Sequence, residues 1–228
     1  RADTPAPKQM AKHVTECRRV KMTDFFTRLA VAIGLGLAAA PAAAQGVFTP
    51  PDGCTAFLTV QSRSCTVSHY WTCEADPQGT HWRLTMDEEG PAGLSYSDAE
   101  FRWLLQYGLR LGTTSSLIEP EEDPASITEL FATGTDTMVF STLTTGPGIQ
   151  PIQRDYTGFD SLTGEVVTID GHELERTEFR YEYDIGIGPR IVQGNQYVSR
   201  EWRLFFGGEE IVTAPDGSEH EFTLSPPV

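Results

Sequence analysis

Three of the four cysteines in this chain, Cys54, Cys65 and Cys73, lie close together in the sequence and could form a covalent cross-link. If the chain from Cys54 to Cys73 forms a β-hairpin that turns near Arg63, positions whose numbers sum to 127 lie opposite each other, and Cys54 faces Cys73. Cross-strand neighbours approach to about 4.5–5.5 Å, which is within the range that a disulfide requires. We therefore predict a Cys54–Cys73 disulfide.

The other two pairings fit the sequence less well. A Cys54–Cys65 bond would place the turn inside residues 57–61, an apolar run without a turn-forming residue. Cys65 and Cys73 would lie about 26 Å apart on a straight strand. Cys65 is then expected to be the odd thiol, a small buried hydrophobe. A nucleophilic or redox role would need a neighbouring base, and His69 lies about 13 Å further along the same strand.

Several short patterns approximate metal or phosphate sites without meeting their requirements. The run from His172 to Arg176 resembles the H-E-x-x-H zinc motif, but arginine replaces the second ligand, and a turn signal rather than a helix precedes the run. Cys65, His69 and Cys73 recur every four residues, a spacing that converges on a helix and diverges on a strand. The glycines at 186 and 188 are followed by proline, not by a helix that could bind phosphate. We predict no metal, cofactor or catalytic residue from these motifs.

The remaining acids and histidines do not place a general acid opposite a base. Paired carboxylates such as Glu209 and Glu210 are common on turns of acidic proteins and usually face water. A hydrolase built from residues scattered in the sequence would need a polar cleft where His69, His81 or His172 meets a carboxylate. We keep that enzyme as an alternative.

The charge of the chain restricts its partners. The sequence has 17 basic and 32 acidic residues, a net charge of −15 with histidine neutral. The part after Ala44 is more acidic still, with 10 arginines, no lysine and 29 acidic residues. Nucleic acids and anionic lipid surfaces are bound through lysine and arginine side chains that displace counterions. The sequence therefore predicts no binding to nucleic acid.

The N-terminal region has the pattern of a cleaved export signal over Met22–Ala44. The apolar stretch Leu29–Leu37 is followed by a tail of small residues, in which Ala42 and Ala44 fit the A-x-A cleavage rule. Cleavage is expected between Ala44 and Gln45. The apolar stretch is shorter than the roughly 20 residues that cross a bilayer in a helix.

The predicted organisation follows from this signal. Residues 1–21 form an upstream region in which either Met10 or Met22 is the start, residues 22–44 form the signal peptide, and residues 45–228 form one domain. We predict that the mature protein is periplasmic or secreted and has no transmembrane segment.

The mature part has the sequence pattern of an antiparallel all-β protein, with runs of alternating residues between turn dipeptides. Within His172–Tyr183, one face carries Thr177, Phe179 and further aromatic residues, and the other carries only charged ones. From Glu165 onward we predict a meander. Its predicted turns are Asp170-Gly171, Gly194-Asn195, Gly207-Gly208 and Asp216-Gly217.

Two further elements are predicted upstream. Residues Ala99–Leu111 alternate almost throughout and are predicted to form a long strand. Residues Ile127–Ala132 are predicted to form a short helix, with Ser126 as its N-cap and Gly134 as its C-terminal cap. The predicted fold is a curved antiparallel sheet, or a partly open barrel, with one short helix.

Four segments carry a resemblance to other sequences, namely TCEADPQGTHWRLTMDEEGP, EPEEDPASITELFATGTDTMVF, GFDSLTGEVVTIDGHELERTEFRYEY and QYVSREWRLFFGG. On these segments, nearly the whole mature chain resembles an uncharacterised family of exported alphaproteobacterial proteins. This resemblance implies export and a single domain, and it carries no activity or site. The predicted strand order is similar, more loosely, to that of periplasmic half-barrel lipid carriers.

The aromatic residues suggest a function for the predicted sheet. A long antiparallel sheet hides its edges by closing or curling, and a curled sheet often leaves an apolar concavity that holds a ligand. Our leading hypothesis is a non-enzymatic envelope protein that binds a hydrophobic small molecule or a partner protein. The alternatives are the scattered hydrolase and a structural or assembly factor without a small ligand. The tryptophans on predicted strands are Trp71, Trp82, Trp103 and Trp202.

Overall fold

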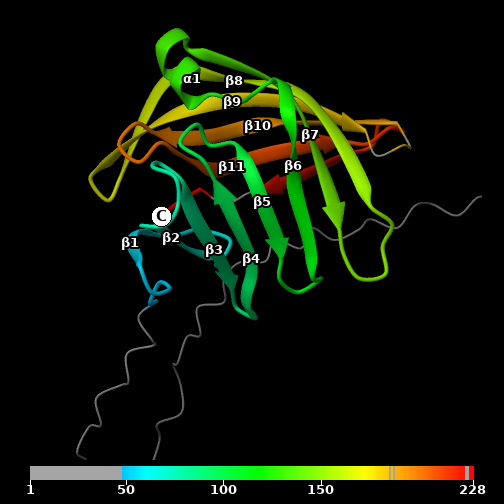
Figure 1. Ribbon diagram of the computed structural model, residues 1–228. Coiled ribbons are helices and arrows are strands. Elements are labelled where there is room, and N and C mark those ends of the chain that lie inside the picture. Colours follow the sequence, from blue (N-terminus) through cyan, green and yellow to red (C-terminus); the bar gives the residue numbers. More distant parts are fainter. Residues whose placement is uncertain (1–47, 185, 187, 224–225) are drawn as a thin grey trace, which may run out of the picture. The chain divides into compact units, whose positions relative to one another are not determined.

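Twelve strands form one antiparallel sheet and follow one another in the sheet in the same order as in the sequence (Figure 1). The computed structural model describes residues 48–184, 186, 188–223 and 226–228, so the predicted signal peptide and its Ala44–Gln45 cleavage point lie outside the described residues. The elements are β1 (Cys54–Gln61), β2 (Val67–Cys73), β3 (His81–Asp87), β4 (Gly90–Ser97), β5 (Trp103–Gly108), β6 (Thr113–Asp123), α1 (Ile127–Thr133), β7 (Thr135–Thr145), β8 (Ile152–Ile169), β9 (His172–Asp184), β10 (Pro189–Ser199), β11 (Leu204–Thr213) and β12 (Glu219–Thr223).

The sheet bends strongly, which brings strands that are distant in sequence into contact. In Figure 1, β3–β7 run steeply down the view, whereas β8–β11 cross it. Tyr70 on β2 contacts Phe206 on β11 with 6.4 Å between ring centroids, and a buried cluster forms around this pair with Leu174 and Leu204. Burial of such apolar surface is the main favourable term in folding. The predicted curved antiparallel sheet with one short helix is confirmed.

The sheet stays open, although its last residues reach back to its first strand. The described strands β1 and β12 do not pair with each other. Instead, the Val228 N–H donates to the Gln61 carbonyl at 3.0 Å, and Ser62 forms an isolated bridge with Pro227. These bonds cover one end of edge strand β1, which would otherwise present unpaired backbone groups.

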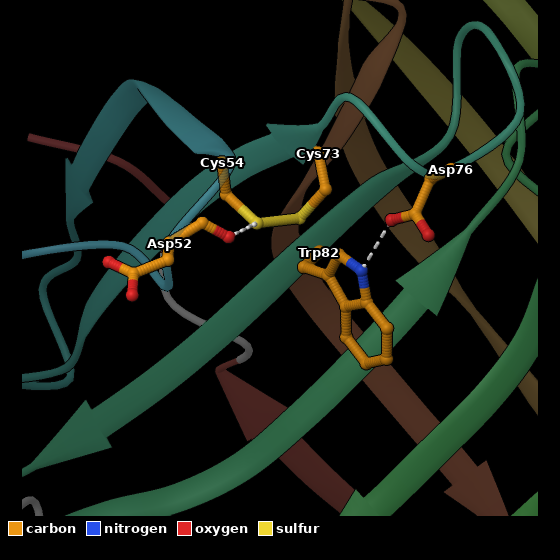
Figure 2. Close-up of a disulfide and its surroundings, with 5 residues drawn as sticks. All are labelled: Asp52, Cys54, Cys73, Asp76 and Trp82. Carbon is orange, nitrogen blue, oxygen red and sulfur yellow. Dashed lines mark hydrogen bonds between the residues drawn. A yellow bond between two sulfur atoms is a disulfide. The ribbon is translucent and has the colours of Figure 1, made fainter.

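The first hairpin has the register that the cysteine spacing predicts. Cys54 pairs with Cys73, and a shift of one residue after Ala56 marks a β-bulge. The two cysteines form a disulfide, with their Cα atoms 4.0 Å apart. Figure 2 shows this bond and Trp82 nearby, whose Nε1–H donates to Asp76 Oδ2 at 2.9 Å.

The prediction that Cys65 is an odd thiol is wrong. The described chain has no free cysteine, and Cys65 is disulfide-bonded. Cys65 also lies outside the strands, in the turn between β1 and β2, with a φ of 61°.

The single predicted helix is present as α1. The Ser126 side chain accepts the Glu129 N–H, and Gly134 ends the helix in the left-handed conformation with a φ of 88°. These are the caps that the sequence predicts. The helix buries Ile127 and Leu130 and packs on β7 and β8. Among the described residues, no helix has the length and apolar character needed to cross a bilayer.

The long strand predicted over Ala99–Leu111 is wrong at both ends, because β5 spans only Trp103–Gly108. Before it, the Asp98 carboxylate accepts the backbone N–H groups of Glu100 at 3.0 Å and Arg102 at 2.9 Å. Such local side-chain bonds give the backbone an alternative to the strand ladder. After Gly108 the chain turns before β6 begins.

Two of the four predicted turns are wrong. The pairs Gly194-Asn195 and Gly207-Gly208 lie inside β10 and β11, and the turn between these strands is at residues 200–203. A Cβ at position 194 would lie 1.9 Å from the Glu209 carbonyl oxygen. Glycine therefore permits a close approach of the two strands where their register shifts, which is a second role of glycine in sheets. The turns at Asp170-Gly171 and Asp216-Gly217 are confirmed.

The alternation predicted for β9 places aromatic residues inside the bend. Thr177 and Phe179 are buried, whereas Glu178 between them is exposed. Strand β7, on the other side of β8, alternates in the same way, with Asp136 and Phe140 buried and Thr137 exposed. Asp136 and Phe140 of β7 and Phe179 of β9 line the site described next.

Candidate functional site

A cavity of about 80 Å³ lies between the two parts of the bent sheet, with the first residues of α1 in its wall. We call it the aromatic cavity. Its residues come from β5 to β11, from α1 and from the turn before β5. The sheet curvature therefore creates the cavity, because no single hairpin could surround it. Its aromatic residues are Phe101, Trp103, Phe140, Phe159, Phe179, Tyr181 and Phe205.

The rings beside the cavity form a continuous ladder across β5, β7, β8 and β9. Trp103 meets Phe140 edge-on at 6.1 Å between centroids, and Phe140 stacks on Tyr156 at 4.8 Å. Tyr156 contacts Tyr181 at 5.9 Å, and Tyr181 stacks against Phe179 at 5.8 Å. Such ring pairs stabilise their own arrangement by more than the burial of their surface area contributes. The cavity therefore has a stiff aromatic wall.

Two carboxylates, Asp136 and Asp160, enter this aromatic wall from neighbouring strands. Asp136 on β7 is the direct cross-strand partner of Asp160 on β8. The Asp136 residue is 4 % exposed, and its Oδ2 accepts the Ser126 N–H at 2.9 Å. Within the described part of the chain, the buried Oδ1 atoms of both aspartates have no hydrogen-bond partner.

Burial changes the protonation of this pair. Burial, and to a smaller extent the neighbouring acids Glu129, Asp123 and Glu100, raises the pKa of Asp136 to about 6. Burial, followed by the charge of Asp136, raises the pKa of Asp160 to about 7. Loss of hydration disfavours a charged carboxylate, and a like charge nearby adds to the effect. The pair is therefore electrostatically strained when both groups are ionised.

The end of the cavity beside α1 is held by a network centred on Glu100. Its carboxylate accepts the Ser126 hydroxyl and the Thr128 N–H, each at 2.9 Å, and pairs with Arg203 at 3.0 Å. Arg203 also donates to the Ala99 carbonyl. These bonds join three segments that are far apart in the sequence. They fix the start of α1 against the turn before β5 and the turn between β10 and β11.

A larger hollow of about 270 Å³, which we call the polar cleft, adjoins the aromatic cavity. The two share Phe101, Trp103, Gln196 and Phe205 as walls. Beyond these walls the lining becomes polar and includes His81. Burial, followed by the charge of Arg83, lowers the pKa of His81 to about 4, so its imidazole is neutral at pH 7.

An open groove of about 590 Å³, the outer groove, borders the aromatic cavity through Phe159 and Phe179. It is formed by β8 to β12, and many of its lining residues are charged. Phe159 is 39 % exposed and Phe179 is 5 % exposed. These two rings are the apolar boundary between the cavity and this side of the molecule.

The three histidines considered for catalysis do not converge. His69 pairs through Nδ1 with the Thr59 hydroxyl at 3.0 Å, and His81 packs against Tyr70 and Phe101. His172 does meet a carboxylate, with Nδ1 3.1 Å from Glu201, but this pair is exposed, with side-chain exposures of 44 % and 63 %. Neither His172 nor Glu201 lines the polar cleft.

Metal-binding chemistry has little support in the residues that the structure describes. No group of three or more histidine, cysteine, aspartate or glutamate side chains is placed to hold an ion. The pattern Cys65, His69, Cys73 cannot supply a thiolate from Cys73, because that sulfur is bonded to Cys54.

The sequence motifs did not identify Asp136 or Asp160 as site residues. One local signal was available, since Asp136 occupies the same face of β7 as Met138 and Phe140, where an apolar residue is the rule. Comparisons with models of known protein families, with curated proteins and with solved structures find no match to this chain.

Proposed function

We propose that this chain is a non-enzymatic exported protein, periplasmic or secreted, that binds a small hydrophobic molecule in the aromatic cavity. The observation that carries this proposal is the ring-lined cavity formed by seven strands and α1. Ligand sites are mostly apolar concavities with a few placed polar groups. The Cys54–Cys73 disulfide is compatible with an oxidising compartment.

The cavity volume restricts the ligand. An apolar cavity of about 150 Å³ holds one benzene molecule, so a cavity of about 80 Å³ is too small for a whole lipid. The adjoining polar cleft of about 270 Å³ brings the combined space to the lower end of the roughly 300–1,000 Å³ range of small-molecule sites. The proposed ligand is therefore slender, with one end between the rings and the rest in the polar cleft.

The resemblances seen in the sequence belong to this proposal. Membership of the uncharacterised exported family would agree with export. The looser likeness to half-barrel lipid carriers would agree with a ligand inside the curved sheet, but the small volume favours a short chain over a full lipid. The exposed position of His172 and Glu201 gives the alternative hydrolase no support.

An Ala125→Leu variant tests whether the aromatic cavity is the binding site. Ala125 lines the cavity, and its enlargement would fill the space that the ligand needs. In titrations with hexan-1-ol followed by backbone amide NMR, we expect saturable shifts at β7 and β9 in the native protein. The variant should bind at least tenfold more weakly, because overlap of side chain and ligand excludes the ligand.

The matched control is Ala132→Leu, which makes the same change at an exposed position of α1. Its affinity for hexan-1-ol should equal that of the native protein. Shifts that appear only around the outer groove, or that persist in Ala125→Leu, would contradict the proposed site.

A further inference from the structure

The paired aspartates in the aromatic cavity are costly for a site that binds only apolar groups. Cross-strand partners have Cβ atoms about 4.5–5.5 Å apart, so the charges of Asp136 and Asp160 repel each other. Both residues line the cavity, and the buried Oδ1 of each has no hydrogen-bond partner among the described residues. A buried acceptor without a donor loses its hydration without compensation, and the loss is larger if the acceptor is charged.

Arg102, which lines the cavity, and Arg203, which holds the start of α1, are already paired with other acids. The Arg102 guanidinium lies 2.6 Å from Asp98 and 2.7 Å from Glu121, whose side chain is 3 % exposed. Arg203 binds Glu100 and the Thr128 hydroxyl. Neither arginine has a hydrogen bond or ion pair with Asp136 or Asp160 in the described contacts. Among the described residues, no ion pair therefore neutralises the aspartate pair.

The rings around the pair favour the same kind of partner. The faces of tryptophan, tyrosine and phenylalanine attract cations, and the attraction is stronger where water is excluded. Trp103, Phe140 and Tyr181 line the cavity together with the two aspartates. A site that combines aromatic faces with carboxylates suits an organic ammonium group, which offers N–H donors to carboxylates and polarised C–H groups to rings.

We infer that the ligand of the aromatic cavity is an alkylammonium compound whose cationic end lies between the aromatic rings and against Asp136 and Asp160. This inference rests on the proposed function, and it specifies which chemical group the cavity holds. The ammonium donates to the unpaired Oδ1 atoms, and its alkyl chain passes Phe101 and Phe205 toward the polar cleft. The net charge of −15 attracts such cations to the protein as a whole.

The size of the cavity agrees with this orientation. About 80 Å³ accommodates an ammonium group and the first carbons attached to it, but not a branched or cyclic amine with a large substituent. A metal ion would fit less well, because no three potential ligand side chains meet among the described residues. An anionic end such as a carboxylate would face two like charges.

Three probes with the same chain separate this inference from the proposed function. Hexylammonium, hexan-1-ol and hexanoate are titrated at pH 8 into the full chain, and backbone amide NMR follows the shifts on β7 and β8. We expect hexylammonium to bind at least tenfold more tightly than hexan-1-ol, and hexanoate to bind more weakly than both. The charge, not the chain, distinguishes the three probes.

Asp160→Asn tests the role of the pair, because the substitution removes the charge and keeps the shape. The variant should lose most of the preference for hexylammonium, so that its affinities for hexylammonium and hexan-1-ol differ by no more than about threefold. The matched control is Asp155→Asn, which makes the same change at an exposed position of β8. That control should retain the full preference.

The outcomes are distinct. Equal binding of hexylammonium and hexan-1-ol by the native protein, or a preference that survives Asp160→Asn, would overturn the inference while leaving the proposed function in place. Absence of saturable binding by all three probes would overturn both. Preference for hexylammonium that Asp155→Asn also abolishes would assign the effect to the general surface charge and would likewise overturn the inference.

Discussion

Replacing Cys54 and Cys73 together by serine is expected to lower the free energy of unfolding by about 3 kcal/mol. The bond closes a loop with a sequence separation of 19 residues, and the chain-entropy estimate for such a loop gives this magnitude. The bond also secures β1, an edge strand whose residues are mostly exposed. Urea unfolding followed by tryptophan fluorescence measures the loss as a lower transition midpoint, with a steeper slope because the unfolded chain without the cross-link exposes more surface.

The double substitution avoids a single unpaired cysteine that could exchange with the disulfide of Cys65. Thr55 and Thr72 provide a matched control, because they are the adjacent cross-strand pair and both are exposed. Their joint replacement by alanine should cost less than about 1 kcal/mol. Equal losses in the two double variants would show that the hairpin contacts, not the disulfide, stabilise this edge.

The Asp160→Asn variant is expected to be more stable than the native protein at pH 8, by roughly 1–3 kcal/mol, and about equally stable at pH 4. Burial raises the pKa values of Asp136 and Asp160 to about 6 and about 7, whereas the unfolded chain releases these protons near pH 4. The folded state therefore holds protons that the unfolded state has lost, and stability falls as pH rises through this window. Asparagine removes one charge and the repulsion between the pair.

Chemical unfolding at intervals between pH 4 and pH 8 measures this effect as the difference between variant and native protein. The Asp155→Asn variant should be less stable than the native protein at pH 8, because hydrogen bonds from Ser141 and Gln153 lower the pKa of Asp155. Its carboxylate stabilises the fold above pH 4, and this contribution is lost in the variant. A destabilised Asp160→Asn variant at pH 8 would contradict the account of a strained acid pair.

Local patterns in the sequence correctly predicted the elements that are held by contacts between residues close in the sequence. The Cys54–Cys73 pairing followed from hairpin geometry, because the two arms are adjacent and one register explains both cysteines. The helix α1 followed from Ser126 and Gly134, whose caps satisfy backbone groups within a few residues. The faces of β9 followed from strict alternation over a long run.

The errors arose where one residue type serves two structural roles. Glycine pairs mark turns, but Gly194 and Gly208 allow close contact between β10 and β11. The alternation of Ala99–Leu111 predicts a strand, but the hydrogen bonds of Asp98 fold its first residues into a turn. Choosing between these roles requires the position of the neighbouring segment of the same chain in the fold.

The candidate site depends on contacts between strands, and the sequence alone does not show which strands meet. The approach of Asp136 to Asp160 follows from the register of β7 with β8. The enclosure of the pair needs the bend that brings Phe205 on β11 to the same cavity as Trp103 on β5. The hypothesis of a concavity in a curled sheet was general, whereas the acid pair within it emerged only from the three-dimensional structure.

The central claim is that the aromatic cavity holds a small ligand in the native protein. Native mass spectrometry of the protein, purified without denaturation from the cells that make it, tests this claim most directly. We predict a mass above that of the polypeptide, from a bound small molecule that collisional activation releases as a cation, and no such adduct in Ala125→Leu prepared in the same way. A bare polypeptide mass for the native protein, or an adduct that Ala125→Leu retains, would contradict the claim.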